Sequence, residues 1–491
     1  MLRTLAIAAA AVALYELLRH AVLARTRASL RKRVRAYAEQ HGVRVDLFKF
    51  GGKLLVREEL LNDLHVVGAM MEAVRKGERA TEVRERVEEY IDEIVPAFSL
   101  TAYFAFGMRL ARGAIRAVYT PLVVQRPTAL PEGATAVFLI NHRSNFDYLV
   151  VGWALARQVA ISYAVGEWAR VFPLDALFKA FGGFFVRRGF PDPLYHTVLR
   201  RYLQLITRQG VTQGIFPEGG LTRDGALRSP KVGLLDALLQ LSADPAFSRD
   251  LYFVPVGINY DRVLEDRALL DEARGREHPP TVGEKLRGAL KLLAIVPARV
   301  LVNLLRVATG RLHRHGYVAV AFGEPVRLRD LPQAAHLRGA SDEQRRALAK
   351  EVAGVLMDRI ARAIPATPVP LVARAALELG PSAPSALAVR VRELKDRLVE
   401  LGVPVALGRE FEPQKAAREE ILEHNRELAR LEGEIVGSEE AEQIVDLGLS
   451  RLVQRGALRV QGGLVGPGRN ADLLAYYARS LACLPDGPPR P

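Results

Sequence analysis

The sequence is poor in the residues that build disulfide frameworks and metal clusters. Its 491 residues include one cysteine, Cys483, which excludes a disulfide framework and a cysteine-rich metal site. The ten histidines are scattered, and we interpret the one close pair, His313 and His315, as solvated surface in a basic loop. There is no Walker motif and no glycine fingerprint of a dinucleotide-binding fold. We therefore expect chemistry that uses no metal and no bound cofactor.

Long apolar runs are also missing. The N-terminal run Leu5–Tyr15 falls well short of the roughly 20 residues that a membrane-spanning helix needs. Thr4–Ala24 could just span a bilayer if it carried Glu16 and Arg19. A dense group of arginines and lysines follows, which would keep the main body on the cytoplasmic side. We expect residues 1–25 to be a membrane anchor or an interfacial helix, and the protein to lie at the cytoplasmic face of the cell membrane.

What the chain has in excess is positive charge. It carries 69 Lys and Arg against 55 Asp and Glu, a formal net charge of +14, and 49% of its residues are hydrophobic. The apolar fraction predicts a folded chain with room for two or three domains. The basic balance suits a phosphorylated substrate, an anionic membrane surface or a nucleic acid.

The hydrophobic pattern divides the chain into helical flanks and an α/β centre. We expect a helical region over residues 26–120, an α/β domain with a mixed sheet over 121–365, and a second helical region over 366–491. The N-terminal helices serve either packing or contact with a membrane or acyl chain. The basic, apolar segment Gly283–Val307 is either a packed helix pair or a segment that lies on an anionic bilayer.

Short apolar runs predict the strands of the central sheet. They are Ala134–Ile140, Ala160–Val165, Phe184–Val186, Gly214–Phe216, Tyr252–Val256 and Val318–Phe322. Near the C-terminus, Leu449–Gly468 predicts a helix followed by a hairpin. That pattern also suits a small nucleic-acid-binding module, but its arginines are few, so we do not expect nucleic acid as a partner.

A histidine and an aspartate follow the first predicted strand of the α/β region. NHRSNFDYLV (Asn141–Val150) lies between that strand and an apolar helix, and it places His142 five residues before Asp147. Ligands of open α/β sheets bind where strands end. An imidazole oriented by a carboxylate can act there as a general base. The alternative is a capping box, with Ser144 as N-cap and Asp147 at the third helical position.

Two further stretches offer cations and flexible turns. In FGGFFVRRGF (Phe181–Phe190), Arg187 and Arg188 follow an apolar strand, and arginine suits bidentate binding of phosphate. Adjacent residues of a strand point to opposite faces, so we expect only one of the two in a cleft. The alternative is a pair of surface arginines.

GIFPEGGLTRDG (Gly214–Gly225) runs from a strand into a glycine turn. Gly219 and Gly220 let backbone N–H groups approach an anion, and Glu218 could accept a substrate hydroxyl or hold an arginine. We expect positive charge from Arg223 and Lys231. The alternative is a plain Pro/Gly turn. The strand FVPVGINYDR (Phe253–Arg262), which contains Pro255, offers little chemistry alone.

Together the four stretches resemble, in order and spacing, the four sequence blocks of the glycerolipid acyltransferases. The matching pieces are NHRSNFD, GGFFVRR, FPEGGLTRDG and VPVGINYDR. The second and third look more like glycerol-3-phosphate or dihydroxyacetone-phosphate enzymes than second-step lysophosphatidate enzymes. YYARSLA (Tyr476–Ala482) is similar to the C-terminal tail of the glycerol-3-phosphate group.

The resemblance implies an acyltransferase that moves a fatty acyl group from acyl-CoA or acyl-carrier protein to the sn-1 hydroxyl of glycerol 3-phosphate. It implies His142 as general base with Asp147 as its partner. It assigns binding of the phosphorylated acceptor to Arg187, less surely Arg188, Glu218, Gly219 and Arg223. From the residues of the loop itself we add Gly220 and Lys231 to this binding set. Leu221 replaces an arginine that many members carry, so part of the phosphate-binding charge is lost there, and Lys231 could compensate.

Two other functions stay open. The same residues would suit dihydroxyacetone phosphate or lysophosphatidate as acceptor. A membrane-associated scaffold with an inactive acyltransferase fold would carry the same sequence pattern without turnover.

Overall fold

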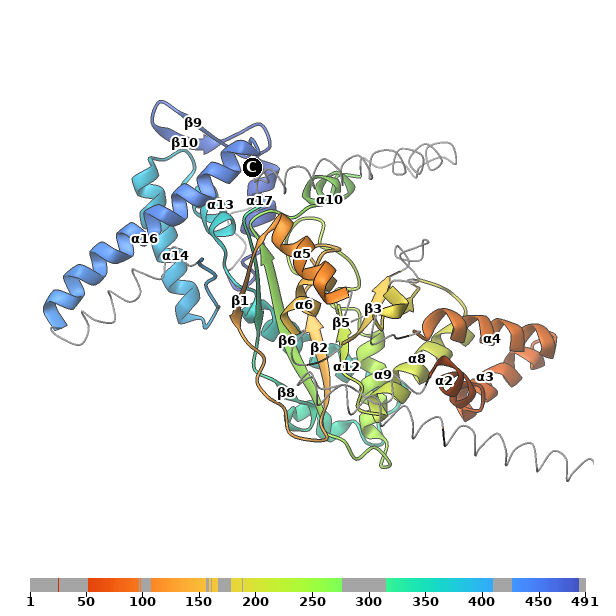
Figure 1. Cartoon of the computed structure of the whole chain (residues 1–491). Coiled ribbons are helices and arrows are strands. Elements are labelled where there is room, and N and C mark those ends of the chain that lie inside the picture. The colour runs from red at the N-terminus through yellow and green to blue at the C-terminus, as the bar shows by residue number, and fades with distance from the viewer. Residues whose placement is uncertain are drawn as a thin grey trace, which may run out of the picture. The chain divides into compact units, whose positions relative to one another are not determined.

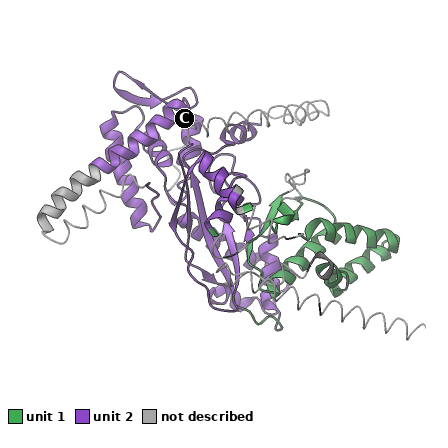
Figure 2. Ribbon diagram, in the orientation of Figure 1, with its two compact units in different colours: residues 1–108, 155–213, 246–249 green, residues 109–154, 214–245, 250–491 purple. Residues whose placement is uncertain are grey.

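The computed structural model describes residues 25, 52–96, 98, 107–155, 159, 161–166, 178–187, 189–275, 315–408 and 426–484. The chain forms two compact units, which Figure 2 shows in separate colours. Unit 1 comprises residues 1–108, 155–213 and 246–249, and unit 2 comprises 109–154, 214–245 and 250–491. The C-terminal helices thus share a unit with the central strands, whereas the sequence pattern set them apart as a separate region.

Unit 1 is mostly helical, as its periodicity predicts. It contains α2 (Gly52–Leu61), α3 (Leu64–Arg75), α4 (Ala80–Ile94) and α8 (Pro193–Arg208), with the parallel pair β3 (Ser162–Gly166) and β4 (Phe184–Val186). Capping residues fix two of these helices. Asp63 accepts hydrogen bonds from His65 N and Val66 N at the start of α3, and Asp192 accepts one from Leu194 N at the start of α8.

Unit 2 is built on a mixed sheet. Its strands follow the order β1-β7-β6-β2-β5. They are β1 (Thr120–Gln125), β7 (Tyr317–Phe322), β6 (Leu251–Tyr260), β2 (Thr135–Ile140) and β5 (Gln213–Ile215), and β8 (Val326–Arg327) pairs with β6. β2 runs parallel to β6, and β7 runs antiparallel to it. The predicted α/β class with a mixed sheet is confirmed.

Each predicted strand is present, but β1 and β8 were not predicted. β1 contains Pro121, which argues against a central strand because proline cannot donate to a ladder. Among the described strands, β1 stands at the end of the order and pairs with β7, so the missing N–H is tolerated at this edge. β8 has two residues, too few to show alternation.

Alternate residues of a strand point to opposite sides, and the two faces of β6 contact different helices. On one face, Gly257 lies against the end of α12 (Asp342–Ala363), and Asn259 donates to the carbonyl of Pro365 at 3.0 Å. On the other, Tyr260 meets Tyr119, which follows α5 (Met108–Val118), and Asp147, which begins α6 (Asp147–Leu155). Figure 1 shows these helices along the sheet.

The remainder of unit 2 is helical apart from one hairpin. It contains α9 (Gly233–Ala243), α10 (Asp266–Ala273), the 3-10 helices η4 (Leu328–Asp330) and η5 (Pro332–His336), α13 (Pro368–Leu379), α14 (Pro384–Glu400), α16 (Arg426–Gln454) and α17 (Asp472–Ala478). The antiparallel strands β9 (Leu458–Gln461) and β10 (Leu464–Pro467) follow α16. The helix and hairpin expected over Leu449–Gly468 are therefore confirmed.

Several expectations concern residues outside the described part of the chain. The candidate anchor over residues 1–25 lies outside it except for Arg25, and so do Gly283–Val307 and Arg188. Across the ranges that are described, no helix has the length and apolarity needed to cross a membrane.

The close approach of β6 and α12 makes a prediction about two glycines. A Cβ at Gly257 would lie 2.1 Å from the backbone of Ala363, so Gly257→Ala should lower the free energy of unfolding by about 2 kcal/mol or more. Gly354, exposed within α12, has open space around its Cα, so Gly354→Ala should raise stability by about 0.5–1 kcal/mol. Urea unfolding of both variants measures the difference, and equal effects would contradict this packing.

Candidate active site

The turn between β2 and α6 brings His142 and Asp147 together. β2 ends at Ile140 and α6 begins at Asp147, so the two side chains meet across a short loop. His142 Nδ1 lies 3.0 Å from Asp147 Oδ2, and both side chains are buried. Because the carboxylate accepts, this bond assigns the proton to Nδ1 and leaves Nε2 able to accept one. This is the geometry that a general base requires.

Asp147 is held by more than His142. Its Oδ2 also accepts from the backbone N–H groups of Arg143 at 2.7 Å and Ser144 at 3.0 Å. Its Oδ1 accepts from the hydroxyl of Tyr260 at 2.6 Å. Burial raises the pKa of Tyr260 well above its ordinary value, and Asp147 adds to the rise, so the hydroxyl stays protonated and donates. Sequence reasoning missed Tyr260, although it stands in the fourth block.

The alternative capping box is only partly present in this loop. Ser144 Oγ accepts from Phe146 N at 3.1 Å, and Asp147 Oδ2 accepts from Ser144 N at 3.0 Å. Asp147 N donates to the backbone carbonyl of Ser144 and not to its hydroxyl, and Asp147 is the first residue of α6 and not the third. The bonds of Ser144 therefore stabilise the loop before α6, and they leave Asp147 free to orient the imidazole.

Aromatic rings enclose the imidazole. The ring centroid of Phe216 lies 4.2 Å from that of His142, and the centroid of Tyr148 lies 5.6 Å away. Only 1% of His142 is exposed, and its Nε2 makes no hydrogen bond to any residue that the structure describes. The imidazole is thus almost fully covered by neighbouring side chains.

Glu218 supports His142 from the backbone side. Its Oε1 accepts from His142 N at 2.7 Å, and its Oε2 accepts from Arg228 N at 2.9 Å. Burial raises the pKa of Glu218 to about 7, although both N–H bonds and the charge of Arg143 oppose the rise. One role expected for Glu218 was to hold an arginine. Glu218 does bind Arg228, but through the backbone N–H of that residue and not through its guanidinium.

The glycine turn after Glu218 packs against Lys231. Gly219 has a φ of +64°, which favours glycine, and a Cβ there would lie 2.8 Å from Lys231 Cγ. Lys231 N donates to the Pro217 carbonyl at 2.7 Å, while its side chain is exposed. Gly220 is buried beside them. The structure therefore keeps Lys231 next to the turn, as the sequence predicted.

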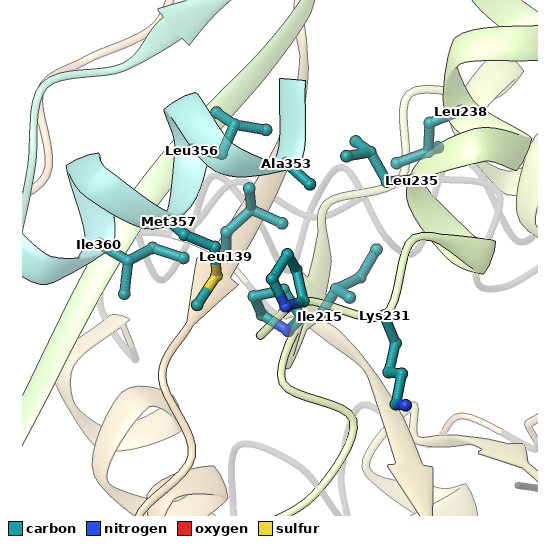
Figure 3. A pocket seen from close by; sticks show the side chains of 11 residues that line it. Leu139, Ile215, Lys231, Leu235, Leu238, Ala353, Leu356, Met357 and Ile360 are labelled. Carbon is teal, nitrogen blue, oxygen red and sulfur yellow. The ribbon is translucent and has the colours of Figure 1, made fainter. Parts of the chain in front are cut away.

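An apolar pocket of about 20 Å³ lies under the ends of β2 and β5. Its lining includes Leu139, Ile215, Leu235 and Leu356, and Figure 3 shows Lys231 among them with its amine directed away from the aliphatic side chains. A volume of this size holds about one water molecule. It is too small for an acyl chain, so we assign it to packing between the sheet, α9 and α12.

The two arginines of this loop have different partners. Arg223 is half exposed and forms an ion pair with Glu272 of α10, so its expected role in phosphate binding competes with this contact. Arg228, which sequence reasoning missed, donates from Nη1 to the carbonyl of Leu221 at 3.1 Å. The guanidinium of Arg228 therefore lies next to Leu221, which replaces an arginine of the family pattern.

Arg187 belongs to unit 1 and is strongly engaged there. Its Nε donates to Glu93 Oε1 at 2.8 Å, and a second bond joins Nη2 to Oε2 of the same carboxylate. Its guanidinium carbon lies 4.5 Å from the centre of the Phe190 ring. The hydrogen bond to Glu93 raises the pKa of Arg187. These contacts give Arg187 a structural role within unit 1.

Two further expectations concern packing and metal. Pro255 lies within β6, where its carbonyl accepts from Gly323 N at 2.8 Å. His315 is not solvated surface as expected: it lies beside Tyr119, and burial lowers its pKa to about 4. Within the described ranges no group of His, Cys, Asp or Glu side chains could hold a metal ion.

The raised pKa of Glu218 predicts how stability depends on pH. The folded state keeps a proton up to about pH 7, whereas the unfolded chain releases it near 4.5. This contribution is therefore full below pH 4.5 and is lost as the pH rises through 7, at a cost of about 3 kcal/mol. Glu218→Gln should flatten the slope of unfolding free energy between pH 5 and 8, and the exposed Glu343→Gln should not. Parallel slopes for all three proteins would contradict the prediction.

The site lies in a segment with known relatives. Residues 121–259 match the family model described as Acyltransferase, and residues 301–470 match the glycerol-3-phosphate acyltransferase C-terminal region. A protein of Alteromonas mediterranea named glycerol-3-phosphate acyltransferase is 28% identical over 334 residues, which are 64% of this chain and 38% of that protein. One of the same name from Aeromonas hydrophila is 29% identical over 303 residues, 59% of this chain and 35% of that protein.

Among solved structures, the 1-acyl-sn-glycerophosphate acyltransferase PlsC from Thermotoga maritima aligns with 62% of this chain and 95% of its own, at 15% identity and a TM-score of 0.29. The chain spans little more than a third of the length of the two curated relatives. The two family models follow each other in the order seen here and together match more than half of the sequence. The chain therefore belongs to the glycerolipid acyltransferases that combine an acyltransferase domain with the C-terminal region of glycerol-3-phosphate acyltransferases.

Proposed function

We propose that this chain transfers a fatty acyl group from an acyl thioester to the sn-1 hydroxyl of glycerol 3-phosphate, which gives lysophosphatidate. The observation that carries the proposal is the hydrogen bond of 3.0 Å between His142 Nδ1 and Asp147 Oδ2, inside the segment that matches the acyltransferase family. The names of the curated relatives support the choice of acceptor. The donor is acyl-CoA or an acyl-carrier protein.

The reaction follows from the assigned proton positions. His142 Nε2 accepts the proton of the sn-1 hydroxyl while the oxygen attacks the thioester carbonyl carbon and forms the new ester bond. The tetrahedral intermediate then collapses, the carbon–sulfur bond breaks, and the thiolate takes the proton from the imidazolium. Asp147 holds the ring and stabilises its charged form. General base catalysis of this kind contributes about 10²–10⁴-fold.

Burial of His142 makes access a part of the mechanism. The rings of Phe216 and Tyr148 pack beside the imidazole and limit the access of water to the base. For the reaction, the acceptor hydroxyl has to come within about 3 Å of Nε2. Once the site is dry, the hydrogen bonds on Asp147 act in a low dielectric and are stronger than in water.

We propose that basic residues of the loop after β5 bind the phosphate of the acceptor. Arg228 and Lys231 both contact this loop, Arg228 through the carbonyl of Leu221 and Lys231 through its side chain beside Gly219. Arg223 joins them if phosphate displaces Glu272. A charge-assisted bond to phosphate fixes the remote end of the substrate and so orients its hydroxyl.

We further propose that the protein works at the cytoplasmic face of the cell membrane and contacts its anionic surface. The net charge of +14 and the apolar N-terminal segment followed by arginines support this location. We also propose an acyl-carrier protein as an alternative donor partner.

Removal of the base provides the direct test of the activity. His142→Ala should reduce acyl transfer from labelled acyl-CoA to glycerol 3-phosphate by at least about 10²-fold. The other described groups bonded to Asp147 Oδ2 are backbone N–H donors, which cannot accept the proton of the substrate hydroxyl. His196→Ala, which changes a histidine of unit 1, is the control. Glycerol 3-phosphate, dihydroxyacetone phosphate and lysophosphatidate are assayed in parallel. A His142→Ala protein that retains activity within a few-fold of the parent would rule out the mechanism.

The phosphate site is tested by a split between substrates. Arg228→Ala leaves the backbone N–H on Glu218 but removes the guanidinium, so the KM for glycerol 3-phosphate should rise about 10–100-fold while the KM for acyl-CoA stays constant. Arg267→Ala, an exposed change on α10, serves as the control. Equal increases in both KM values would argue against phosphate binding at Arg228.

A further inference from the structure

The C-terminal helix α17 lies beyond the two segments that the family models match. The second family model ends at residue 470, and α17 begins at Asp472. Its two tyrosines, Tyr476 and Tyr477, are fully buried and stand edge to face with ring centroids 5.3 Å apart. The contacts of these buried side chains include Arg143 of the catalytic loop and residues that support this loop.

Tyr476 lies next to a buried arginine of the catalytic loop. Only 2% of Arg143 is exposed, and its guanidinium carbon is 5.4 Å from the centre of the Tyr476 ring. Its Nη1 donates to the carbonyl of Gly225 at 3.0 Å, whereas Nε and Nη2 have no hydrogen-bond partner in the described part of the chain. The aromatic face and one carbonyl are therefore the contacts that hold this buried cation.

Arg143 connects Tyr476 to the proposed base. The backbone N–H of Arg143 donates to Asp147 Oδ2 at 2.7 Å, and the same oxygen orients His142. The guanidinium on Tyr476 and the N–H on Asp147 belong to the same residue, so loss of the ring contact would remove one of the contacts that fix Arg143. Tyr476 thus lies one residue away from the hydrogen bonds that set the position of the imidazole.

The loop around Gly225 provides a second connection. A Cβ at Gly225 would lie 1.8 Å from the carbonyl oxygen of Tyr476, so this loop rests directly on the backbone of α17. Thr222, in the same loop, donates from its N–H to the carbonyl of His142 at 3.0 Å. Arg479, just after α17, forms an ion pair of 2.8 Å with Asp224.

Tyr477 supports the opposite side of the catalytic loop. Its hydroxyl donates to Asp266 Oδ2 at 2.5 Å and accepts from Val263 N at 3.2 Å. The neighbouring Glu265 accepts from Ser144 Oγ at 2.7 Å and from Asn145 N at 3.2 Å. Three successive residues of the loop, from Arg143 to Asn145, are thereby held by segments that rest on α17.

We infer that α17 positions the catalytic loop, with Tyr476 as a positioning residue that acts on Asp147 and His142 through Arg143. This inference rests on the proposed function for its kinetic consequence, but the structural consequence is independent of it. The two tyrosines differ in their hydroxyl groups. That of Tyr476 has no partner among the described residues, so its ring is the part expected to act, whereas that of Tyr477 makes two hydrogen bonds.

The test compares two substitutions of Tyr476 in the full chain. Tyr476→Phe keeps the ring beneath Arg143, so kcat should stay within about twofold of the parent. Tyr476→Leu removes the ring and should lower kcat by about 10–100-fold, as expected when a reacting group is displaced by a fraction of an ångström, with little change in either KM. A general loss of folded protein would instead lower the active fraction of both variants and show in the unfolding midpoint.

Amide hydrogen exchange gives a readout that needs no activity. Exchange in a peptide covering residues 141–147 should rise in Tyr476→Leu and not in Tyr476→Phe, because the amides of His142, Arg143 and Ser144 are bonded to buried carboxylates. A peptide covering α14 serves as the internal control. If Tyr476→Leu proves too unstable, Arg143→Lys, which alters the planar cation above the ring, should raise exchange in the same peptide.

The outcomes separate the two proposals. A parent chain without turnover on any acceptor, combined with the expected exchange pattern, would overturn the proposed function and leave the positioning role intact. An active parent whose Tyr476→Leu variant matches Tyr476→Phe in kcat and in exchange would overturn the positioning role. Equal rises in exchange over residues 141–147 and α14 would likewise overturn it, because they would indicate general loosening.

Discussion

The buried carboxylate of Asp147 is the constraint around which the site of unit 2 is arranged. A carboxylate with no exposed surface is costly unless hydrogen bonds replace its water. Four donors do so, namely His142 Nδ1, the N–H groups of Arg143 and Ser144, and the Tyr260 hydroxyl. Three of them come from one tight loop, and the fourth comes from β6. The loop can therefore reach its observed shape only when β2 and β6 are neighbours in the sheet, as their parallel pairing makes them.

The two buried acids of the site perform different tasks for the same histidine. Asp147 acts on the ring of His142, and Glu218 acts on its backbone N–H. The imidazole is thus fixed both by its own side-chain bond and by the position of the residue that carries it. Arg143 lies close enough to oppose the rise in the pKa of Glu218 that burial causes. One cation between two acids limits the net charge that the interior must hold, which explains why an arginine is buried there.

Local patterns in the sequence predicted the parts of the molecule that depend on neighbouring residues. The six strands and the His142–Asp147 pair follow from hydrophobic runs and from the loop that links β2 to α6. Tyr260 and Arg228 could not be found in this way, because each gains its role from a partner that is distant or in a different turn. Arg223 and Arg187 illustrate the converse. Their sequence context suggests phosphate binding, but carboxylates from α10 and α4 occupy them, and no spacing rule reveals such partners.

The C-terminal region is a structural part of the site and cannot be regarded as an appended module. α12 packs against one face of β6. α17 contacts the segments that hold the catalytic loop, through Tyr476 and Tyr477. Arg451 of α16 forms an ion pair with Asp261, just after β6, and Arg455, just after α16, forms one with Asp266, the first residue of α10. If the segment 121–259 stood alone, Arg143 would lose its aromatic contact with Tyr476, and Ser144 and Asn145 would lose their hydrogen bonds to Glu265. The observed position of the catalytic loop therefore depends on residues that follow the acyltransferase segment.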